Sequence, residues 1–271
     1  MSKIGIISGG GKLPILIGNN LIKKNYDVTF FPIKDTFDKQ IYSNVKTIEI
    51  KLNSIKKILK KLEENQISKI ILAGNISRPS LKDINFDFET LNFARQLFLS
   101  KKGDNELLIT ITKLFKDKGF EYLNWKNYCP ELFSSQNNLT NRLPSKEANL
   151  NLVKALNIFK NYGNLDIGQS LIVQNEIVLG LEAAEGTDKL IKRCNELKKT
   201  GDKGVLIKAS KYNQSNILDV PTIGTHTLKL LIENDYEGVF IEKNNCLIID
   251  QDEVINLANI NSLFISTFEK L

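Results

Sequence analysis

The first half of the chain alternates short apolar runs with segments whose apolar residues recur at helical spacing. Apolar or alternating runs predict strands over Lys3–Ser8, Asp27–Ile33, Val45–Ile50 and Lys69–Ile76. Helical spacing predicts helices after Gly11, after an N-cap at Ser54, and over roughly 89–99 and 105–118. This alternation is typical of a parallel, doubly wound sheet, on which ligands bind beyond the carboxyl ends of the strands. We therefore expect a Rossmann-like α/β domain over residues 1–132.

The second half also mixes strands and helices. Strand patterns predict one hairpin from Ser170–Gln174 and Ile177–Glu182 turning at Asn175-Glu176, a strand at Gly204–Ala209, and a second hairpin from Gly238–Glu242 and Cys246–Asp250. Helices are expected at Ala148–Phe159, after N-caps at Thr187 and Thr225, and at Glu253–Asn259. A polar stretch without periodicity, 134–142, separates the two halves. We expect a linker over 133–145 and a mixed α/β catalytic domain over 146–271.

Charge and composition exclude several classes of protein. The chain has 271 residues and a net charge of +6, and its lysines are dispersed among acidic residues. We therefore expect no nucleic-acid partner. Three separated cysteines and a single histidine favour a reduced, cytoplasmic protein without a structural zinc site. No apolar run approaches the ~20 residues that span a bilayer, and no signal peptide is evident, so any membrane contact is expected to be peripheral.

Three consecutive glycines, Gly9, Gly10 and Gly11, lie between the first predicted strand and helix. Such a loop lets backbone amides approach a phosphate, which a helix N-terminus then favours. The string G-G-G-K-L-P lacks the third glycine of a dinucleotide fingerprint, because Pro14 stands there. It is not a Walker A loop either, because Leu13 follows Lys12. A phosphate contact and a simple tight turn both remain open.

Two further polar positions follow in the first half. Arg78, one of four arginines, lies in G-N-I-S-R-P-S after a predicted strand. Its planar fork suits a phosphate or carboxylate, and the alternative is a surface arginine before a proline stop. Asp104, in G-D-N, is expected to be a helix N-cap.

The stretch G-L-E-A-A-E-G-T-D gathers Glu182, Glu185 and Asp188 where a predicted strand meets a helix. Three close carboxylates repel one another unless they are solvated or bridged by a cation. Mg²⁺ prefers oxygen ligands of this kind. The residues alone leave both a solvated acidic helix start and a metal site open.

A second loop, L-D-V-P-T-I-G-T-H-T, carries Asp219 just ahead of a predicted helix. Loops like this hold functional residues on a rigid frame. Lys208 and Lys211 lie upstream, near enough to serve an anionic ligand. His226 could serve as a general acid or belong to the capping turn of the helix, and the residues alone leave both interpretations open.

Six motifs occur in one order along the chain: I-S-G-G-G-K-L-P, G-N-I-S-R-P-S, K-G-D-N-E-L-L, L-G-L-E-A-A-E-G-T-D, G-V-L-I-K-A-S-K and D-V-P-T-I-G-T-H-T. Together they resemble the magnesium-dependent UDP-2,3-diacylglucosamine pyrophosphatases of Gram-negative lipid A biosynthesis, the class unrelated to the dinuclear metallophosphoesterases. The resemblance covers nearly the whole chain. It implies hydrolysis of UDP-2,3-diacylglucosamine to UMP and 2,3-diacylglucosamine 1-phosphate (lipid X).

The resemblance also implies roles for single residues. Asp219 matches the essential acidic residue of a D-x-P-x-x-G motif, and with Lys208 and Glu185 it forms the implied catalytic set. Asp219, Glu182 and Asp188 are the implied ligands of Mg²⁺. The implied substrate-binding residues are Gly10, Gly11, Lys12, Arg78, Asp104, Thr187, Lys211 and Thr222. A homodimer and a peripheral contact with the inner membrane stay open.

The chain departs from the family pattern in two stretches. The family motif K-P-x-Q-D-x-R is K-Y-N-Q-S-N-I here, so Ser215 replaces an Asp and Ile217 replaces an Arg. If that Arg binds phosphate, Lys208 or Lys211 must substitute for it, or the activity is weakened. Asn105 also stands where a second Asp is common.

Other functions compete with this interpretation. The substituted positions suit a nucleotide-sugar or lipid-binding protein without catalysis. The N-terminal glycines suit an NAD(P)-dependent oxidoreductase, although Pro14 argues against it. A purely structural protein would not explain the Asp219 loop.

Overall fold

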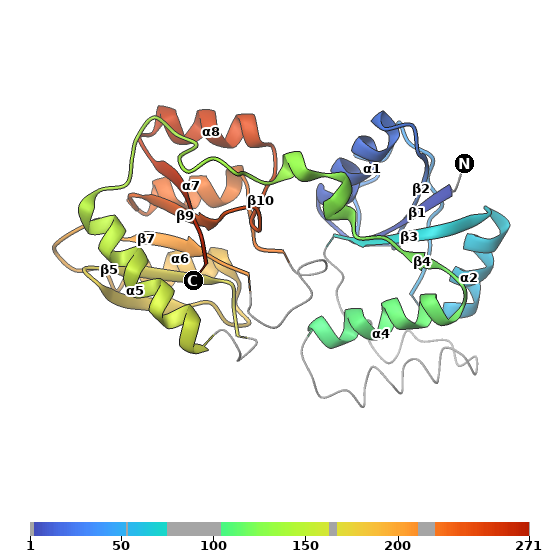
Figure 1. Cartoon of the computed structure of the whole chain (residues 1–271), viewed down its shortest axis with the longest axis horizontal. Helices are drawn as coiled ribbons and strands as arrows, with labels where there is room; N and C mark the ends of the chain where they lie inside the picture. The colour runs from blue at the N-terminus through green and yellow to red at the C-terminus, as the bar shows by residue number, and fades with distance from the viewer. Residues whose placement is uncertain (1–2, 53, 75–103, 163–166, 211–219, 271) are drawn as a thin grey trace. The chain divides into compact units, whose positions relative to one another are not determined.

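The structure, a computed structural model, describes residues 3–52, 54–74, 104–162, 167–210 and 220–270. The chain divides into two compact units, Met1–Cys129 and Pro130–Leu271. Each unit is built around its own central sheet, the first parallel and the second mixed (Figure 1). The expected α/β fold class is therefore confirmed.

The first unit contains a four-stranded sheet in the order β2-β1-β3-β4, in which every neighbouring pair is parallel. Its elements are β1 (Lys3–Ser8), α1 (Leu13–Lys23), β2 (Asp27–Pro32), α2 (Ile55–Glu64), β3 (Ile67–Ala73), α4 (Asp104–Asp117), β4 (Glu121–Tyr122) and a 3-10 helix at Trp125–Tyr128. The chain places β2 on one side of β1 and β3 on the other. The carboxyl ends of β1 and β3 therefore form a topological switch point, the place where ligands bind in open parallel sheets.

Helices cover both faces of this sheet. Phe30 and Phe31 are consecutive and fully buried on β2, so their side chains point to opposite faces. On one face the Phe30 ring lies so close to Gly18 of α1 that a Cβ there would be 2.0 Å from it. On the other face Leu62 of α2 would lie 3.4 Å from a Cβ on Gly5 of β1. The doubly wound arrangement follows from this packing.

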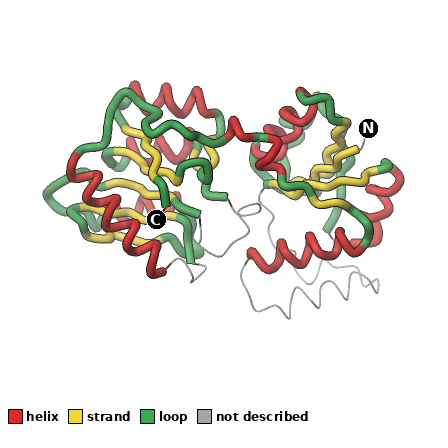
Figure 2. The backbone as a smooth tube through the Cα atoms, viewed as in Figure 1, coloured by secondary structure: helices red, strands yellow, loops and turns green. Residues whose placement is uncertain are grey.

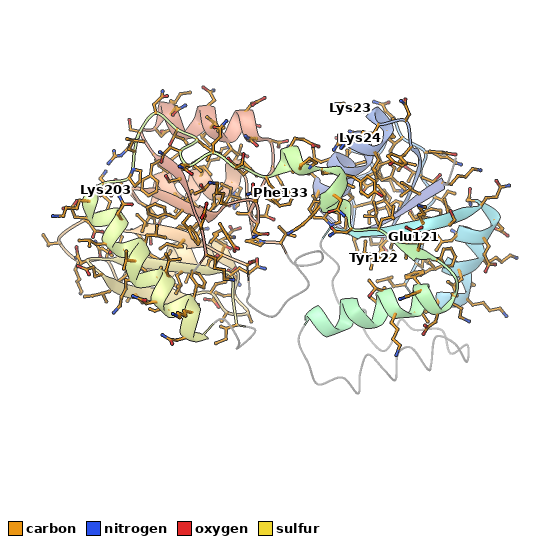
Figure 3. The ribbon with its side chains drawn as sticks, in the orientation of Figure 1. Lys23, Lys24, Glu121, Tyr122, Phe133 and Lys203 are labelled. Atoms are coloured by element: carbon orange, nitrogen blue, oxygen red, sulfur yellow. The ribbon has the colours of Figure 1, made fainter. Side chains whose placement is uncertain are left out.

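The two edges of the sheet are irregular. The expected strand at Val45–Ile50 is wrong as a continuous strand, because the segment forms only two isolated bridges, Phe30↔Thr47 with β2 and Ile33↔Ile50 just beyond it. Only Ile50 of these six residues is buried, so little packing supports a regular ladder. At the opposite edge, Glu121 lies on the two-residue strand β4 (Figure 3). Its carboxylate is 3.1 Å from the ammonium of Lys69 on β3.

The second unit contains a five-stranded sheet in the order β11-β9-β7-β5-β6 and a two-stranded sheet of β8 and β10. Its elements are a 3-10 helix at Pro130–Leu132, α5 (Lys146–Tyr162), β5 (Ser170–Gln174), β6 (Ile177–Leu181), α6 (Thr187–Asn195), β7 (Val205–Lys208), β8 (Thr222–Ile223), α7 (Thr225–Glu233), β9 (Gly238–Glu242), β10 (Leu247–Ile248), α8 (Gln251–Ile260) and β11 (Phe264–Phe268). Strands β7, β9 and β11 are parallel, whereas β5 is antiparallel to both of its neighbours.

Helices lie on both faces of the five-stranded sheet of the second unit (Figure 2). Strand alternation therefore divides the core of this unit into two layers. Val205 and Ile207 of β7 pack in the cluster that includes Ala155 and Phe159 of α5. Leu206, between them, packs in the cluster built with α6, α7 and α8. Lys208 comes two residues after Leu206 on β7, so its side chain points to the same face of the sheet, which α6 covers.

The first hairpin is confirmed and the second is wrong. β5 and β6 pair antiparallel, and Asn175 and Glu176 adopt φ values of 51° and 57°, as a two-residue type I′ turn requires. β9, by contrast, is a central strand with parallel partners β7 and β11 on both edges. Residues 246–250 therefore cannot pair with it, and β10 pairs in parallel with β8 instead.

Helix starts and the last strand also differ from expectation. Gly186 and Gly224, not Thr187 and Thr225, are the N-caps of α6 and α7. Each threonine is instead the first helical residue, and the Thr187 hydroxyl bonds to a side chain outside the helix. Strand β11 was not anticipated. The polar segment 133–145, expected to be a linker, hydrogen-bonds to β11 through Leu139 N–H and the carbonyl of Ile265, 3.0 Å apart.

No described helix is both long and apolar enough to cross a membrane.

Candidate active site

A partly buried hydrogen-bonded cluster lies at the carboxyl end of β7 in the second unit. The Lys208 ammonium donates a 2.8 Å hydrogen bond to the hydroxyl of Thr187, and only 5% of Lys208 is exposed. The Thr187 hydroxyl in turn donates to a carboxylate oxygen of Glu182, at 2.9 Å. The cluster therefore links an ammonium to a carboxylate through one hydroxyl.

Four elements position this cluster. Ser170 on β5 and Lys208 on β7 are partners in the antiparallel register, and the Ser170 hydroxyl lies 3.3 Å from that of Thr187. Glu182 follows β6 directly, and its second oxygen accepts the backbone N–H of Gln169, at 3.1 Å. Thr187 opens α6, so its hydroxyl reaches back over the ends of β5 and β7. Ser170 was not anticipated, because a single serine at a strand end carries no signal in the sequence.

Glu185 is engaged in an ion pair on the same loop. Its Oε1 accepts from Nη2 and Nε of Arg193, at 2.7 and 3.1 Å, and its Oε2 accepts the Ala183 N–H at 3.1 Å. The hydrogen bond from Arg193 lowers the pKa of the Glu185 carboxyl. Arg193 also donates to the carbonyl of Leu181. These contacts brace the turn between β6 and α6.

Asp188 contacts a histidine from the neighbouring helix. Its Oδ2 lies 3.2 Å from Nε2 of His226, and both side chains are more than half exposed. The two residues come from the first turns of α6 and α7, so the pair joins two adjacent helix starts. His226 thus contacts the acidic motif, although its sequence position gave no reason to expect this partner.

The three carboxylates expected to act together therefore have separate partners. Within the described residues, no group of three His, Cys, Asp or Glu side chains lies close enough to hold a metal ion. Both oxygens of Glu182 and of Glu185 accept hydrogen bonds, which leaves Asp188 as the open carboxylate of the motif. Mg²⁺ in phosphate chemistry needs one or two carboxylates together with water and substrate oxygens. The predicted metal set of Glu182, Asp188 and Asp219 includes a residue outside the described part of the chain, so it stays a prediction.

Several expected residues fall outside the described part of the chain. They are Arg78, Lys211 and Asp219, together with the departures at Ser215 and Ile217 and the helix expected near 89–99. Asp104 begins α4, but its side chain is also outside the described part. Thr222 begins β8, and its hydroxyl donates to the carbonyl of Val220, at 2.9 Å.

The glycine loop lies at the switch point of the first unit. Gly9 N–H donates to the carbonyl of Ala73 at the end of β3, at 2.9 Å. Gly74 has a φ of 86°, and a Cβ there would be 2.7 Å from the carbonyl oxygen of Gly10. Gly11 has a φ of 89° with open space around it, and Lys12 is the N-cap of α1. The loops after β1 and β3 therefore touch through their backbones, and the turn opens directly onto a helix N-terminus.

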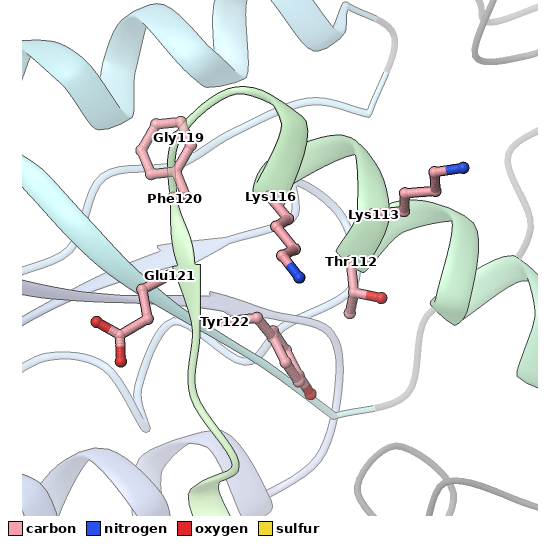
Figure 4. Close-up of a pocket in the computed structure, with 7 residues that line it drawn as sticks. All are labelled: Thr112, Lys113, Lys116, Gly119, Phe120, Glu121 and Tyr122. Atoms are coloured by element: carbon pink, nitrogen blue, oxygen red, sulfur yellow. The ribbon is translucent and has the colours of Figure 1, made fainter.

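An open pocket of about 710 Å³ lies elsewhere in the first unit, beside α4 and β4 (Figure 4). Its lining residues are Thr112, Lys113, Lys116, Gly119, Phe120, Glu121 and Tyr122. The Tyr122 hydroxyl is buried and has no hydrogen-bond partner among the described residues, and burial raises the pKa of Tyr122. Of the residues expected to bind substrate, those whose side chains the structure describes do not line this pocket.

Comparisons with known proteins match both halves of the chain. The family model described as LpxI N-terminal domain matches residues 3–132, and that described as LpxI C-terminal domain matches residues 135–266. The UDP-2,3-diacylglucosamine pyrophosphatase LpxI of Caulobacter vibrioides is 29% identical over 272 aligned residues, which cover 98% of this chain and 97% of that protein. The buried Lys208 cluster and the glycine loop each lie within one of the two matched domains. Since the two domain models together match nearly the whole chain, it belongs to the LpxI family.

Proposed function

We propose that this protein hydrolyses the pyrophosphate bond of UDP-2,3-diacylglucosamine, releasing UMP and 2,3-diacylglucosamine 1-phosphate for lipid A biosynthesis. Family membership supports a pyrophosphatase, and the similar Caulobacter protein is named for this substrate. The observation that carries the proposal is the buried ammonium of Lys208 at the carboxyl end of β7.

The charge of the substrate explains why such an ammonium matters. The bridging pyrophosphate carries anionic oxygens that repel an attacking water, and further charge develops on the leaving phosphate. Of the three N–H groups of Lys208, one donates to Thr187, and the described residues provide no acceptor for the other two. A buried cation with donors to spare stabilises developing negative charge more strongly than a solvated one.

The Lys208, Thr187 and Glu182 chain holds that cation in place. Thr187 accepts from the ammonium and donates to Glu182, so the direction of both hydrogen bonds is fixed. We assign Lys208 the role of binding the pyrophosphate oxygens, with Thr187 and Glu182 as positioning residues. The backbone amides of Gly10 and Gly11, with Lys12, would bind a phosphate or the nucleotide.

Asp219 and Mg²⁺ enter the proposal through the family resemblance. Mg²⁺, when bound, would neutralise the charge of the pyrophosphate. Asp219 is the carboxylate that we propose to orient the attacking water or to bind the cation. A homodimer and a peripheral membrane contact are proposed on the same basis.

The test is UMP release from UDP-2,3-diacylglucosamine, measured with Mg²⁺, with EDTA, and with EDTA followed by excess Mg²⁺. We expect release only when Mg²⁺ is present, and we expect Asp219→Ala to abolish it without changing the melting temperature. Asp235→Ala is the matched control, because Asp235 is an exposed partner of Lys203 and lies outside the six family motifs. No release in any buffer would refute the proposed reaction.

Two additional measurements separate the competing functions. Binding of UDP-2,3-diacylglucosamine without any UMP release would indicate a binding protein. A fluorescence titration with NADPH that saturates would instead indicate an oxidoreductase.

A further inference from the structure

Ser210 lies two residues after the end of β7, and its N–H, hydroxyl and carbonyl groups all hydrogen-bond to two side chains that are distant in the sequence. Glu242, at the end of β9, accepts both the backbone N–H and the hydroxyl of Ser210 on its Oε2, each at 2.7 Å. The Lys270 ammonium donates to the Ser210 carbonyl. Glu242 and Ser210 are 4% and 6% exposed, so water does not compete for these bonds.

We propose that Glu242 is a positioning residue, which fixes the end of β7 and thereby the Lys208 ammonium. This inference rests on the proposed function. Glu242 makes no described hydrogen bond to Lys208 or Thr187, so it acts through the backbone. A carboxylate gives charge-assisted hydrogen bonds, about twice as strong as neutral ones, which suits a clamp of this kind.

The backbone path from the clamp to the cluster is short. Ser210 follows Ala209, whose N–H donates to the carbonyl of Gln169, at 2.9 Å. The N–H of Gln169 donates to Glu182, which accepts from Thr187. A shift of the backbone at Ser210 would therefore move Lys208, two residues earlier on the chain. It would also move Glu182, through the hydrogen bonds of Gln169. A displacement of about 1 Å at a reacting group can reduce a rate about a hundredfold.

The other end of β9 provides a matched control. Glu237, which precedes β9, accepts the backbone N–H and the hydroxyl of Ser145, at 2.8 and 2.9 Å. It is 5% exposed, and like Glu242 it accepts both the backbone N–H and the hydroxyl of one serine. Each carboxylate has one further neighbour: Arg142 lies 3.8 Å from Glu237, and Asn245 donates to Glu242 at 2.9 Å. Ser145 lies at the start of α5, where its hydroxyl also accepts the N–H of Ala148. Since β9 is parallel to β7, Glu237 lies at the opposite end of the sheet from Lys208.

The experiment compares Glu242→Gln with Glu237→Gln in the full chain, measuring kcat and KM for UMP release together with the melting temperature. We expect similar falls in melting temperature, because each variant loses one buried charge-assisted clamp. We expect kcat to fall about tenfold in Glu242→Gln and to stay within twofold in Glu237→Gln. Should either variant fail to fold, Ser210→Ala and Ser145→Ala remove one hydrogen bond from each clamp and repeat the comparison.

The outcomes are distinct. Equal effects of the two variants on kcat, or an unchanged kcat in Glu242→Gln, would overturn the positioning role while leaving the proposed reaction intact. Absence of UMP release from the wild-type protein would overturn the proposed function itself, and with it this role.

Discussion

The ammonium of Lys208 and the hydroxyl of Thr187 lie 2.8 Å apart, at the end of β7 and the start of α6. Strand register brings Lys208 beside Ser170, and helix α6 places Thr187 over both of them. The pair thus joins two motifs that are separate in the sequence, the acidic loop and the strand lysine. This relationship supports the first two predictions.

Replacing Lys208 by Met should reduce kcat/KM for UMP release at least about a hundredfold, as the loss of one buried electrostatic donor typically does. Folding should survive, because a buried charge is exchanged for an apolar chain of similar length. Lys203→Met is the control, since Lys203 pairs with Asp235 on the surface, and its rate should stay within twofold. A Lys208→Met protein that keeps half of the wild-type rate would contradict the assignment.

Thr187→Val should lower kcat about tenfold, because it leaves the buried Lys208 ammonium and Glu182 without the hydroxyl that joins them. The variant should also lose about 1–3 kcal/mol of unfolding free energy, the usual cost of unpaired buried polar groups. Thr187→Ser keeps the hydroxyl and should restore both quantities. Chemical denaturation and UMP release check the prediction, and equal behaviour of the Val and Ser variants would refute it.

The Glu185–Arg193 ion pair should make stability depend on pH. The pair lowers the pKa of Glu185, so its stabilisation is fully present above the unfolded pKa of about 4.5 and is lost as the pH falls through the lower, folded pKa. Because both side chains are partly exposed, we expect only about 0.5 kcal/mol at pH 7.

Urea unfolding of the wild type and of Glu185→Gln between pH 7 and pH 3 measures this difference. The two curves should converge at low pH. A difference that grows as the pH falls would have the wrong sign for this ion pair.

Gly74→Ala should destabilise the protein more than Gly119→Ala. Both glycines have positive φ values, 86° and 88°, so both substitutions carry a backbone cost of about 1 kcal/mol. Only at Gly74 would the new Cβ also come within 2.7 Å of the Gly10 carbonyl oxygen, whereas Gly119 has open space around it. We expect a total loss of about 2–4 kcal/mol for Gly74→Ala. Equal melting temperatures for the two variants would show that the loops after β1 and β3 do not touch.

Much of the fold followed from local patterns. Apolar periodicity located most described strands and helices, and Asn175-Glu176 predicted its turn, because these signals depend on residues close in sequence. The prediction of the second hairpin was wrong because both edges of β9 are already paired, with β7 and β11, and local sequence does not reveal these partners. Strand β11 was missed for the same reason, since a short apolar run at the end of the chain does not show where it pairs.

The sequence by itself determined the elements, the order of the family motifs and the gathering of Glu182, Glu185 and Asp188 in one loop. Only the tertiary structure decided what each carboxylate does there: Glu182 bonds Thr187, Glu185 pairs with Arg193, and Asp188 faces His226. The tertiary structure likewise buried Lys208 and set Glu242 against Ser210. The physical reason is that the partner of a side chain depends on strand register, on the face of the sheet to which the side chain points, and on where the helices pack. Interactions between residues far apart in the chain determine all three.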